Sequence, residues 1–166
     1  MVKQERIKMF GKDGLSGQNA KEHQFVISDI MFDIYDKKNI KSYPELKVEL
    51  KEKTKNGHQK YVIPDIVIYN KKNDGVVFVE IFREEMVKSD SAKLKKLMQQ
   101  HSLPNEGFVY DYENHIWYKV NETKGKKREE NSHSEILDYD FVKPKNDKQL
   151  KSPGKSLKEF LKKQLK

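Results

Sequence analysis

The chain has 166 residues and no cysteine, which is the length of one ordinary domain and excludes disulfide bonds, thiolate zinc sites and cysteine nucleophiles. Hydrophobic residues make up 35% of the chain and charged residues 36%, so the core must be small for this length. No apolar run approaches the roughly 20 residues that cross a bilayer, and no apolar segment follows the charged N-terminus. We therefore expect no membrane span and no secretory signal, and a cytoplasmic location fits.

The net charge of +8 is concentrated near the C-terminal end. Residues 143–166 hold nine lysines against Asp147 and Glu159, a balance of +7, which leaves +1 for the rest of the chain. This distribution indicates a polyanionic partner, nucleic acid first, although a solubilising tail explains it equally well. Lysine outnumbers arginine 31 to 3, and because arginine is the better reader of guanine, contact with the DNA backbone is favoured over base reading. The lysines expected to bind DNA are Lys151, Lys155, Lys158 and Lys162.

The N-terminal part of the chain is expected to form a polar arm followed by a helix. The arm covers residues 1–18, which contain three glycines. The helix covers 19–36, where apolar residues recur at helical spacing. Asn19 followed by Glu22 has the capping-box arrangement, with Asn in place of the usual Ser or Thr, and predicts the start of this helix.

Three strands are expected next, in close succession. The first alternates apolar and polar residues, which predicts a half-exposed strand. The third is apolar almost throughout, which predicts a central strand covered on both faces. The dipeptide Asn56-Gly57 predicts a hairpin turn between the first two strands. The three predicted strands cover residues 46–51, 61–69 and 76–82.

The second half continues with a helix and further strands. The expected elements are a helix over 85–101, strands at 108–110, 116–120 and 136–137, and a short basic helix over 156–166. The order α-β-β-β-α-β-β predicts a three-layer α/β core, in which helices cover both faces of a mixed sheet. We assign this core to residues 19–122 and a basic C-terminal extension to residues 123–166.

Two carboxylates interrupt strands that are otherwise apolar. Asp65 follows Pro64 in the second strand, and Glu80 stands inside the third. A carboxylate in a buried strand is costly to desolvate unless a partner neutralises it. Two such carboxylates on neighbouring strands would converge on one divalent cation, and Mg²⁺ prefers hard oxygen ligands of this kind. A metal held in this way activates water for phosphodiester hydrolysis.

Pro64-Asp65, followed after about fifteen residues by Glu80 in an apolar strand, resembles the PD-(D/E)XK nuclease, or restriction-endonuclease-like, superfamily. The predicted order of elements also matches the core of that superfamily. The resemblance implies a restriction-endonuclease-like fold and a metal-dependent endonuclease that acts on DNA. It implies that Asp65 and Glu80 hold Mg²⁺ or Mn²⁺, that Glu22 is an additional acidic ligand, and that the backbone carbonyl of Ile81 is a further ligand.

The lysine of the family pattern is displaced in this sequence. Phe82 stands two residues after Glu80, where the pattern has lysine. One branch of the superfamily supplies the lysine from the next helix, in a D-x-x-x-K-L motif, before a strand that ends in aspartate. Asp90-Ser91-Ala92-Lys93-Leu94 has this order with one residue fewer, and Asp111 ends the next strand. On this resemblance Lys93 is catalytic: it orients or deprotonates the attacking water and offsets charge on the phosphate.

Each of these residues also has a plainer interpretation. Asp65 after a proline would shape a strand end, and Glu80 would pair with a neighbouring arginine or lysine. Glu22 would cap its helix, and Lys93 would be one of several lysines on a solvated helix face. Of the histidines, only His23 stands next to a candidate ligand.

Two other functions remain open beside the nuclease. Phe82 at the lysine position, together with the basic end of the chain, favours a nucleic-acid-binding protein of the same fold without catalysis. The short chain with polar ends favours a protein-interaction module, such as an accessory or inhibitor protein of a mobile element. A homodimer or a larger protein complex is compatible with all three. If the two carboxylates meet, they repel one another without a cation, so Asp65→Asn is expected to stabilise the metal-free protein.

Overall fold

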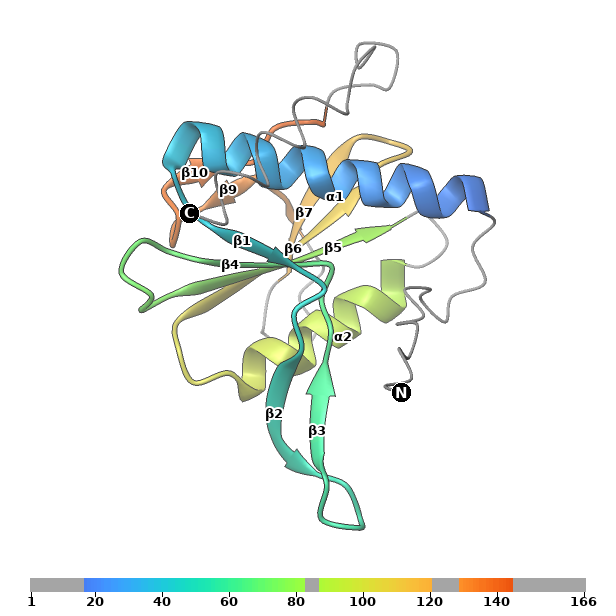
Figure 1. Cartoon of the computed structure of the whole chain (residues 1–166), viewed down its shortest axis with the longest axis vertical. Helices are drawn as coiled ribbons and strands as arrows, with labels where there is room; N and C mark the ends of the chain where they lie inside the picture. Colours follow the sequence, from blue (N-terminus) through green and yellow to red (C-terminus); the bar gives the residue numbers. More distant parts are fainter. Residues whose placement is uncertain (1–16, 83–86, 121–128, 145–166) are drawn as a thin grey trace, which may run out of the picture.

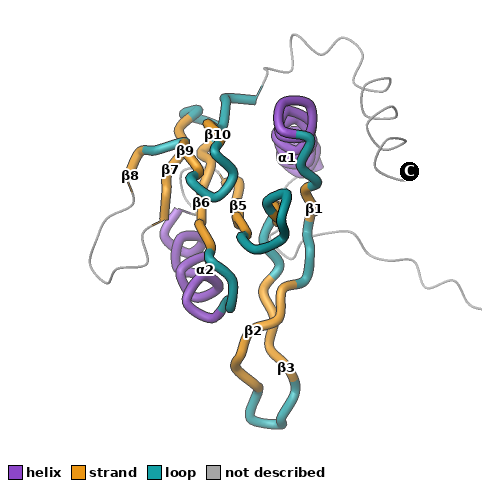
Figure 2. The backbone as a smooth tube through the Cα atoms, turned by 90° about the vertical axis from the view of Figure 1, so that its left-hand side faces the viewer, coloured by secondary structure: helices purple, strands orange, loops and turns teal. Residues whose placement is uncertain are grey.

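The computed structural model describes residues 17–82, 87–120 and 129–144 of the chain. In chain order the elements are α1 (Gly17–Lys38), β1 (Ser42–Pro44), β2 (Val48–Lys53), β3 (Gln59–Val62), β4 (Ile66–Tyr69), β5 (Val76–Phe82), α2 (Val87–Gln100), β6 (Asn105–Asp111), β7 (Ile116–Val120), β8 (Glu129–Glu130), β9 (His133–Ser134) and β10 (Tyr139–Asp140). Six strands in the order β1-β4-β5-β6-β7-β8 form one sheet, with α1 on one face and α2 on the other (Figures 1 and 2). The predicted three-layer α/β fold with a mixed sheet is confirmed.

The centre of the sheet is the parallel pair β5 and β6, and every other pair of neighbouring strands is antiparallel. Parallel neighbours need a crossover connection, which α2 supplies. All seven residues of β5 are buried, as expected for an apolar strand covered on both faces. None of the described helices has the length and apolar character needed to cross a bilayer.

Side chains of β5 alternate between two hydrophobic clusters, one on each face of the sheet. Val79 and Ile81 pack in the cluster that contains the apolar face of α1. Phe78 and Phe82 pack in the cluster that contains the apolar face of α2. Because Glu80 stands between Val79 and Ile81, alternation directs its side chain to the α2 face of the sheet.

The prediction of one strand over residues 61–69 is wrong. The chain forms β3 and β4 with a break at residues 63–65, and Pro64 lies in this break. Proline has no N–H to donate to a strand ladder, so strand pairing ends there. Among the described strands, β2 and β3 therefore pair with each other alone, and β4 joins the main sheet between β1 and β5. The pairing strand β1 was not predicted.

Two other local predictions are corrected. α1 begins at Gly17, so Asn19 lies inside the helix and cannot be its N-cap as the capping box predicted. Residues 136–137 were predicted as a strand but form part of the turn between β9 and β10. Leu137 is buried in the α1-side cluster, and Asp138 has a positive φ of 48°. Ile136 and Leu137 thus contribute to the core from a turn and not from a strand.

The core extends beyond the predicted boundary at residue 122. Leu137, Tyr139 and Phe141 belong to the α1-side cluster, and the Trp117 indole Nε1 donates a hydrogen bond to the carbonyl of Val142 at 3.1 Å. Residues 129–144 are therefore part of the folded core. The predicted helix over 156–166, with the DNA-binding role of Lys151, Lys155, Lys158 and Lys162, lies outside the described residues.

A buried carboxylate on β6 holds this C-terminal segment to the sheet. Glu106 lies 2.6 Å from the Lys119 ammonium and accepts hydrogen bonds from the Ser134 hydroxyl at 2.5 Å and the Glu135 N–H at 3.2 Å. Burial raises the pKa of Glu106, but the ammonium of Lys119 and the hydrogen bonds outweigh it, and the pKa is lowered from 4.5. The ionised form of Glu106 is thus the one that the fold stabilises.

Glu106→Gln is expected to lower the melting temperature, because the amide cannot offset the charge of Lys119, at a cost of roughly 1–3 kcal/mol. Since the native pKa of Glu106 lies below 4.5, its ionised carboxylate stabilises the folded protein fully above pH 4.5. This contribution to the free energy of unfolding is lost as the pH falls through the lowered pKa. Thermal melts of wild type and variant should therefore converge on acidification. Glu130→Gln, at an exposed glutamate, is the control. A difference in melting temperature between wild type and Glu106→Gln that stays the same in acid would contradict the stabilising role of ionised Glu106.

Candidate active site

Asp65 stands at the break before β4, beside the central strand. Ile66 lies opposite Val79 in the β4–β5 register, so Asp65 is one step further along, next to Glu80. The Asp65 carboxylate oxygen Oδ2 accepts a hydrogen bond from the Ile81 N–H at 2.7 Å. A side-chain oxygen thus satisfies an amide that a continued strand would have paired, and this fixes the carboxylate at the sheet edge.

His23 on α1 meets the same edge. Its Nε2 atom lies 3.2 Å from Oδ2 of Asp65 and 3.1 Å from the carbonyl oxygen of Ile81, so one N–H faces two oxygens. Burial lowers the pKa of His23, but the hydrogen bond and charge of Asp65, with the Ile81 carbonyl and the charge of Glu45, outweigh it. The pKa of His23 is therefore raised above 6.5.

Glu80 and Lys93 form an ion pair on the other face of the sheet. Glu80 is 3% exposed, and the Lys93 ammonium lies 2.7 Å from its Oε1 atom. Leu94 and Leu97 of α2 are fully buried against the sheet, so Lys93 sits at the edge of the apolar face of the helix. Its side chain is 34% exposed, so the ammonium contacts both the buried carboxylate and solvent. The structure thus brings together Glu80 and Lys93, two of the residues that the sequence singled out.

The remaining candidates are arranged differently from the family pattern. Asp65 and Glu80 stand at neighbouring positions, but each carboxylate has its own partner, the His23 imidazole and the Lys93 ammonium respectively. The α1 side chain that contacts Asp65 is His23, and Glu22 is its half-buried neighbour in the chain. Within the described ranges, no three or more histidine and acidic side chains gather as a metal site. Sequence reasoning noted His23 only for its position beside Glu22, since its contact with Asp65 spans 42 residues.

The positions of Phe82 and Asp111 explain two features of the sequence motif. Phe82 is 3% exposed in the α2-side cluster, so a lysine there would bury its stem and charge under the helix, whereas Lys93 keeps access to water. Asp111 is also buried, and its Oδ1 atom accepts hydrogen bonds from the N–H groups of Glu113 and Asn114, both at 3.1 Å. Asp111 therefore stabilises the turn between β6 and β7.

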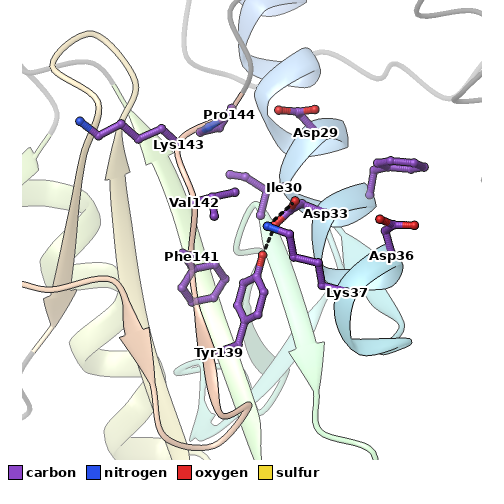
Figure 3. Close-up of a pocket in the computed structure, with 11 residues that line it drawn as sticks. Asp29, Ile30, Asp33, Asp36, Lys37, Tyr139, Phe141, Val142, Lys143 and Pro144 are labelled. Carbon is purple, nitrogen blue, oxygen red and sulfur yellow. Dashed lines mark hydrogen bonds and ion pairs between the residues drawn. The ribbon is translucent and has the colours of Figure 1, made fainter.

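A separate hollow of about 300 Å³ lies on the α1 side, between this helix and residues 139–144 (Figure 3). Three acidic residues of α1 line it, namely Asp29, Asp33 and Asp36. Asp33 pairs with Lys37 at 2.9 Å and accepts a hydrogen bond from the Tyr139 hydroxyl. Lys37 and Lys143 line it as well, and the hollow is separate from the Glu80 and Lys93 pair on the opposite face.

Among solved structures, the chain is similar to the crystal structure of a presumed nuclease belonging to DUF820 from Anabaena variabilis. The TM-score is 0.44 and the sequence identity 12%, over 84% of this chain and 82% of that chain. No family model and no curated protein matches the chain. A function must therefore be derived from the residues of the site themselves.

The contacts of Asp65 reverse the expected effect of Asp65→Asn. Because Asp65 has a histidine and an amide as partners, we expect this variant to lower the melting temperature of the metal-free protein. The raised pKa of His23 means that the imidazolium interaction is fully present below pH 6.5 and is lost as the pH rises through the raised pKa. The decrease in melting temperature caused by Asp65→Asn should therefore be larger at about pH 5.5 than at about pH 8.5, as measured by thermal melts in EDTA.

In the matched control, His23→Gln should abolish this difference between the two pH values. A melting temperature that rises in Asp65→Asn would show instead that repulsion between Asp65 and Glu80 dominates.

Lys93→Met and Glu80→Gln should have unequal effects on stability. Lys93→Met removes the ammonium beside a buried carboxylate, whereas Glu80→Gln removes the buried charge itself. Losing one partner of a fully buried pair costs about 3–5 kcal/mol, and the partial exposure of Lys93 reduces this figure here. Urea unfolding should show Lys93→Met less stable than both Glu80→Gln and the double variant. Lys95→Met on the same helix is the control, and equal losses in the two single variants would count against the buried-charge explanation.

Proposed function

We propose that this protein is a metal-dependent nuclease that hydrolyses phosphodiester bonds in DNA, with the PD-(D/E)XK lysine displaced onto α2. The observation that carries the proposal is the contact of the Lys93 ammonium with the buried Glu80 carboxylate, at 2.7 Å. Glu80 stands on β5, opposite the position of Asp65. Buried ion pairs of this kind add little net stability compared with apolar residues. A carboxylate that is buried on a central strand in spite of its desolvation cost is typical of functional sites.

The residues around Asp65 fit a divalent cation. Oδ2 of Asp65 and the carbonyl oxygen of Ile81 both lie within hydrogen-bonding distance of a single atom, Nε2 of His23, so the two oxygens face a common position. Mg²⁺ and Mn²⁺ accept one or two carboxylates and a carbonyl and complete their coordination with water. Asp65 and Ile81 would hold the ion, with Glu22 as the other acidic candidate on α1. Glu80, the second ligand expected from the sequence, points to the α2 face, where Lys93 is its partner. A bound ion would supply a water of lowered pKa and offset charge on the phosphate.

The ion pair on α2 has a matching role in this proposal. Glu80 fixes the position of the Lys93 ammonium, whose exposed side can contact a phosphate oxygen. An ammonium at that position stabilises the negative charge that develops on the phosphate and orients the attacking water. In this scheme Lys93 is the catalytic residue on the helix, and Glu80 positions it.

A second candidate is a DNA-binding protein of the same architecture without catalysis. The observation that favours it is that each carboxylate already has a polar partner from its own chain, His23 for Asp65 and Lys93 for Glu80. Carboxylates with such partners have less need of a metal ion. Metal binding therefore separates the two functions.

Titration calorimetry with Mn²⁺, followed by plasmid nicking with the same samples, tests the nuclease. We expect the wild type to bind Mn²⁺ and nick DNA, and Asp65→Ala to lose both. Lys93→Ala should keep Mn²⁺ binding but lose nicking by about 10²–10³-fold, the usual effect of removing one group that stabilises transition-state charge.

Two exposed or half-buried positions provide controls for these variants. Asp36→Ala, in the hollow beside α1, should leave Mn²⁺ binding unchanged, and Lys95→Ala should leave nicking unchanged. Mn²⁺ binding that Asp65→Ala does not alter would exclude the proposed site and favour the binding protein.

A further inference from the structure

A two-stranded hairpin projects from the body of the molecule. β2 and β3 pair antiparallel with each other in a sheet of their own, separate from the six-stranded sheet. Figures 1 and 2 show this hairpin extending beyond α2 and away from the six-stranded sheet and α1. An isolated two-stranded hairpin is only marginally stable in water, so contacts at its base must support it.

The base of the hairpin is attached to α2, the helix that carries Lys93. Val48 and Leu50 are buried in the α2-side cluster. Glu52 pairs with Lys96 of α2 at 3.0 Å and with Lys60 of β3 at 3.2 Å. It also accepts a hydrogen bond from the Gln100 side chain. These contacts anchor the hairpin at the end of α2 that lies beyond Lys93.

The Glu52 carboxylate stays ionised in this arrangement. The hydrogen bonds from Lys96, Gln100 and Lys60 lower the pKa of Glu52 from 4.5 to about 2. Lys96 follows Lys93 by one turn of α2, so the hairpin contact and the Glu80 contact lie side by side along one helix. The position of the hairpin is thus linked to the position of the candidate site.

The other face of the hairpin is exposed and basic. Side chains alternate along β2, so residues that flank Val48 and Leu50 point away from α2. Tyr61 on β3 is 50% exposed, and the Lys47 ammonium lies 3.8 Å from the centre of its ring. The exposed charged residues of the hairpin are Lys47, Lys51, Lys53 and Lys55, with Glu49 as the opposing carboxylate.

We propose that the β2–β3 hairpin is an arm that holds duplex DNA beside the Glu80 and Lys93 site, through contacts of its exposed lysines with the phosphate backbone. The inference rests on the proposed function and names the surface that would bring the substrate to that site. Four lysines against one glutamate complement phosphate charge, and lysine contacts phosphate without reading bases. A two-stranded ribbon also has the size that the major groove admits.

Fluorescence anisotropy with a labelled duplex of about 20 base pairs, in EDTA and over a series of salt concentrations, tests the arm on the full chain. Lys51→Gln/Lys53→Gln should weaken binding at least about tenfold at low salt and reduce the salt slope by about 2, because each phosphate contact contributes about 0.9. The matched control is Lys71→Gln/Lys72→Gln, which removes two exposed lysines from the turn between β4 and β5. It should change the affinity by less than about twofold.

Three outcomes would contradict the proposed DNA-binding arm. They are an equal loss of duplex affinity in the two double variants, no loss of affinity in Lys51→Gln/Lys53→Gln, and no duplex binding by the wild type. Tyr61→Ser is a second test that leaves the charge unchanged, and it should also weaken binding. Mn²⁺ titration of the same proteins separates the arm from the nuclease. Hairpin variants that lose DNA binding but keep Mn²⁺ binding would support the proposed arm. A wild type that binds DNA but not Mn²⁺ would contradict the proposed nuclease activity and leave the proposed arm standing.

Discussion

A carboxylate on the central strand of a sheet needs a cation beside it, and the arrangement of this protein depends on how Glu80 obtains one. The strand β5 is buried on both faces, so the cation must come from the helix that covers it. Lys93 reaches Glu80 because Leu94 and Leu97 press α2 against the sheet. The crossover helix that the parallel pair β5 and β6 requires is therefore also the element that delivers the ammonium.

The break at Pro64 links the sheet to the rest of the site. It ends the ladder of β3, so this strand leaves with β2 as a projecting hairpin, while β4 enters the main sheet. The same break frees the Asp65 carboxylate to bind the Ile81 amide and to face His23. One proline thus separates the hairpin from the sheet and places Asp65 beside Glu80. The hairpin and the site share α2 as their common support.

The two faces of the sheet differ in how the chain closes them. On the α1 side, residues 129–144 complete the core, held by the buried contacts of Glu106, and leave an acidic hollow beside the helix. On the α2 side, the helix carries the ion pair of Lys93 with Glu80 and, one turn further along, the contact of Lys96 with Glu52 of the hairpin.

The sequence by itself predicted the two helices, the mixed sheet with its buried central strand, and Asp65, Glu80 and Lys93 as candidate residues. These follow from local signals, since hydrophobic period and charges in apolar runs are visible within a few residues. Only the tertiary structure decided the partners. His23 meets Asp65 across 42 residues, and residues 129–144 join the core through contacts that no local pattern encodes. Pairing in three dimensions also reversed the expected effect of Asp65→Asn, because a carboxylate's stability depends on its neighbours in space.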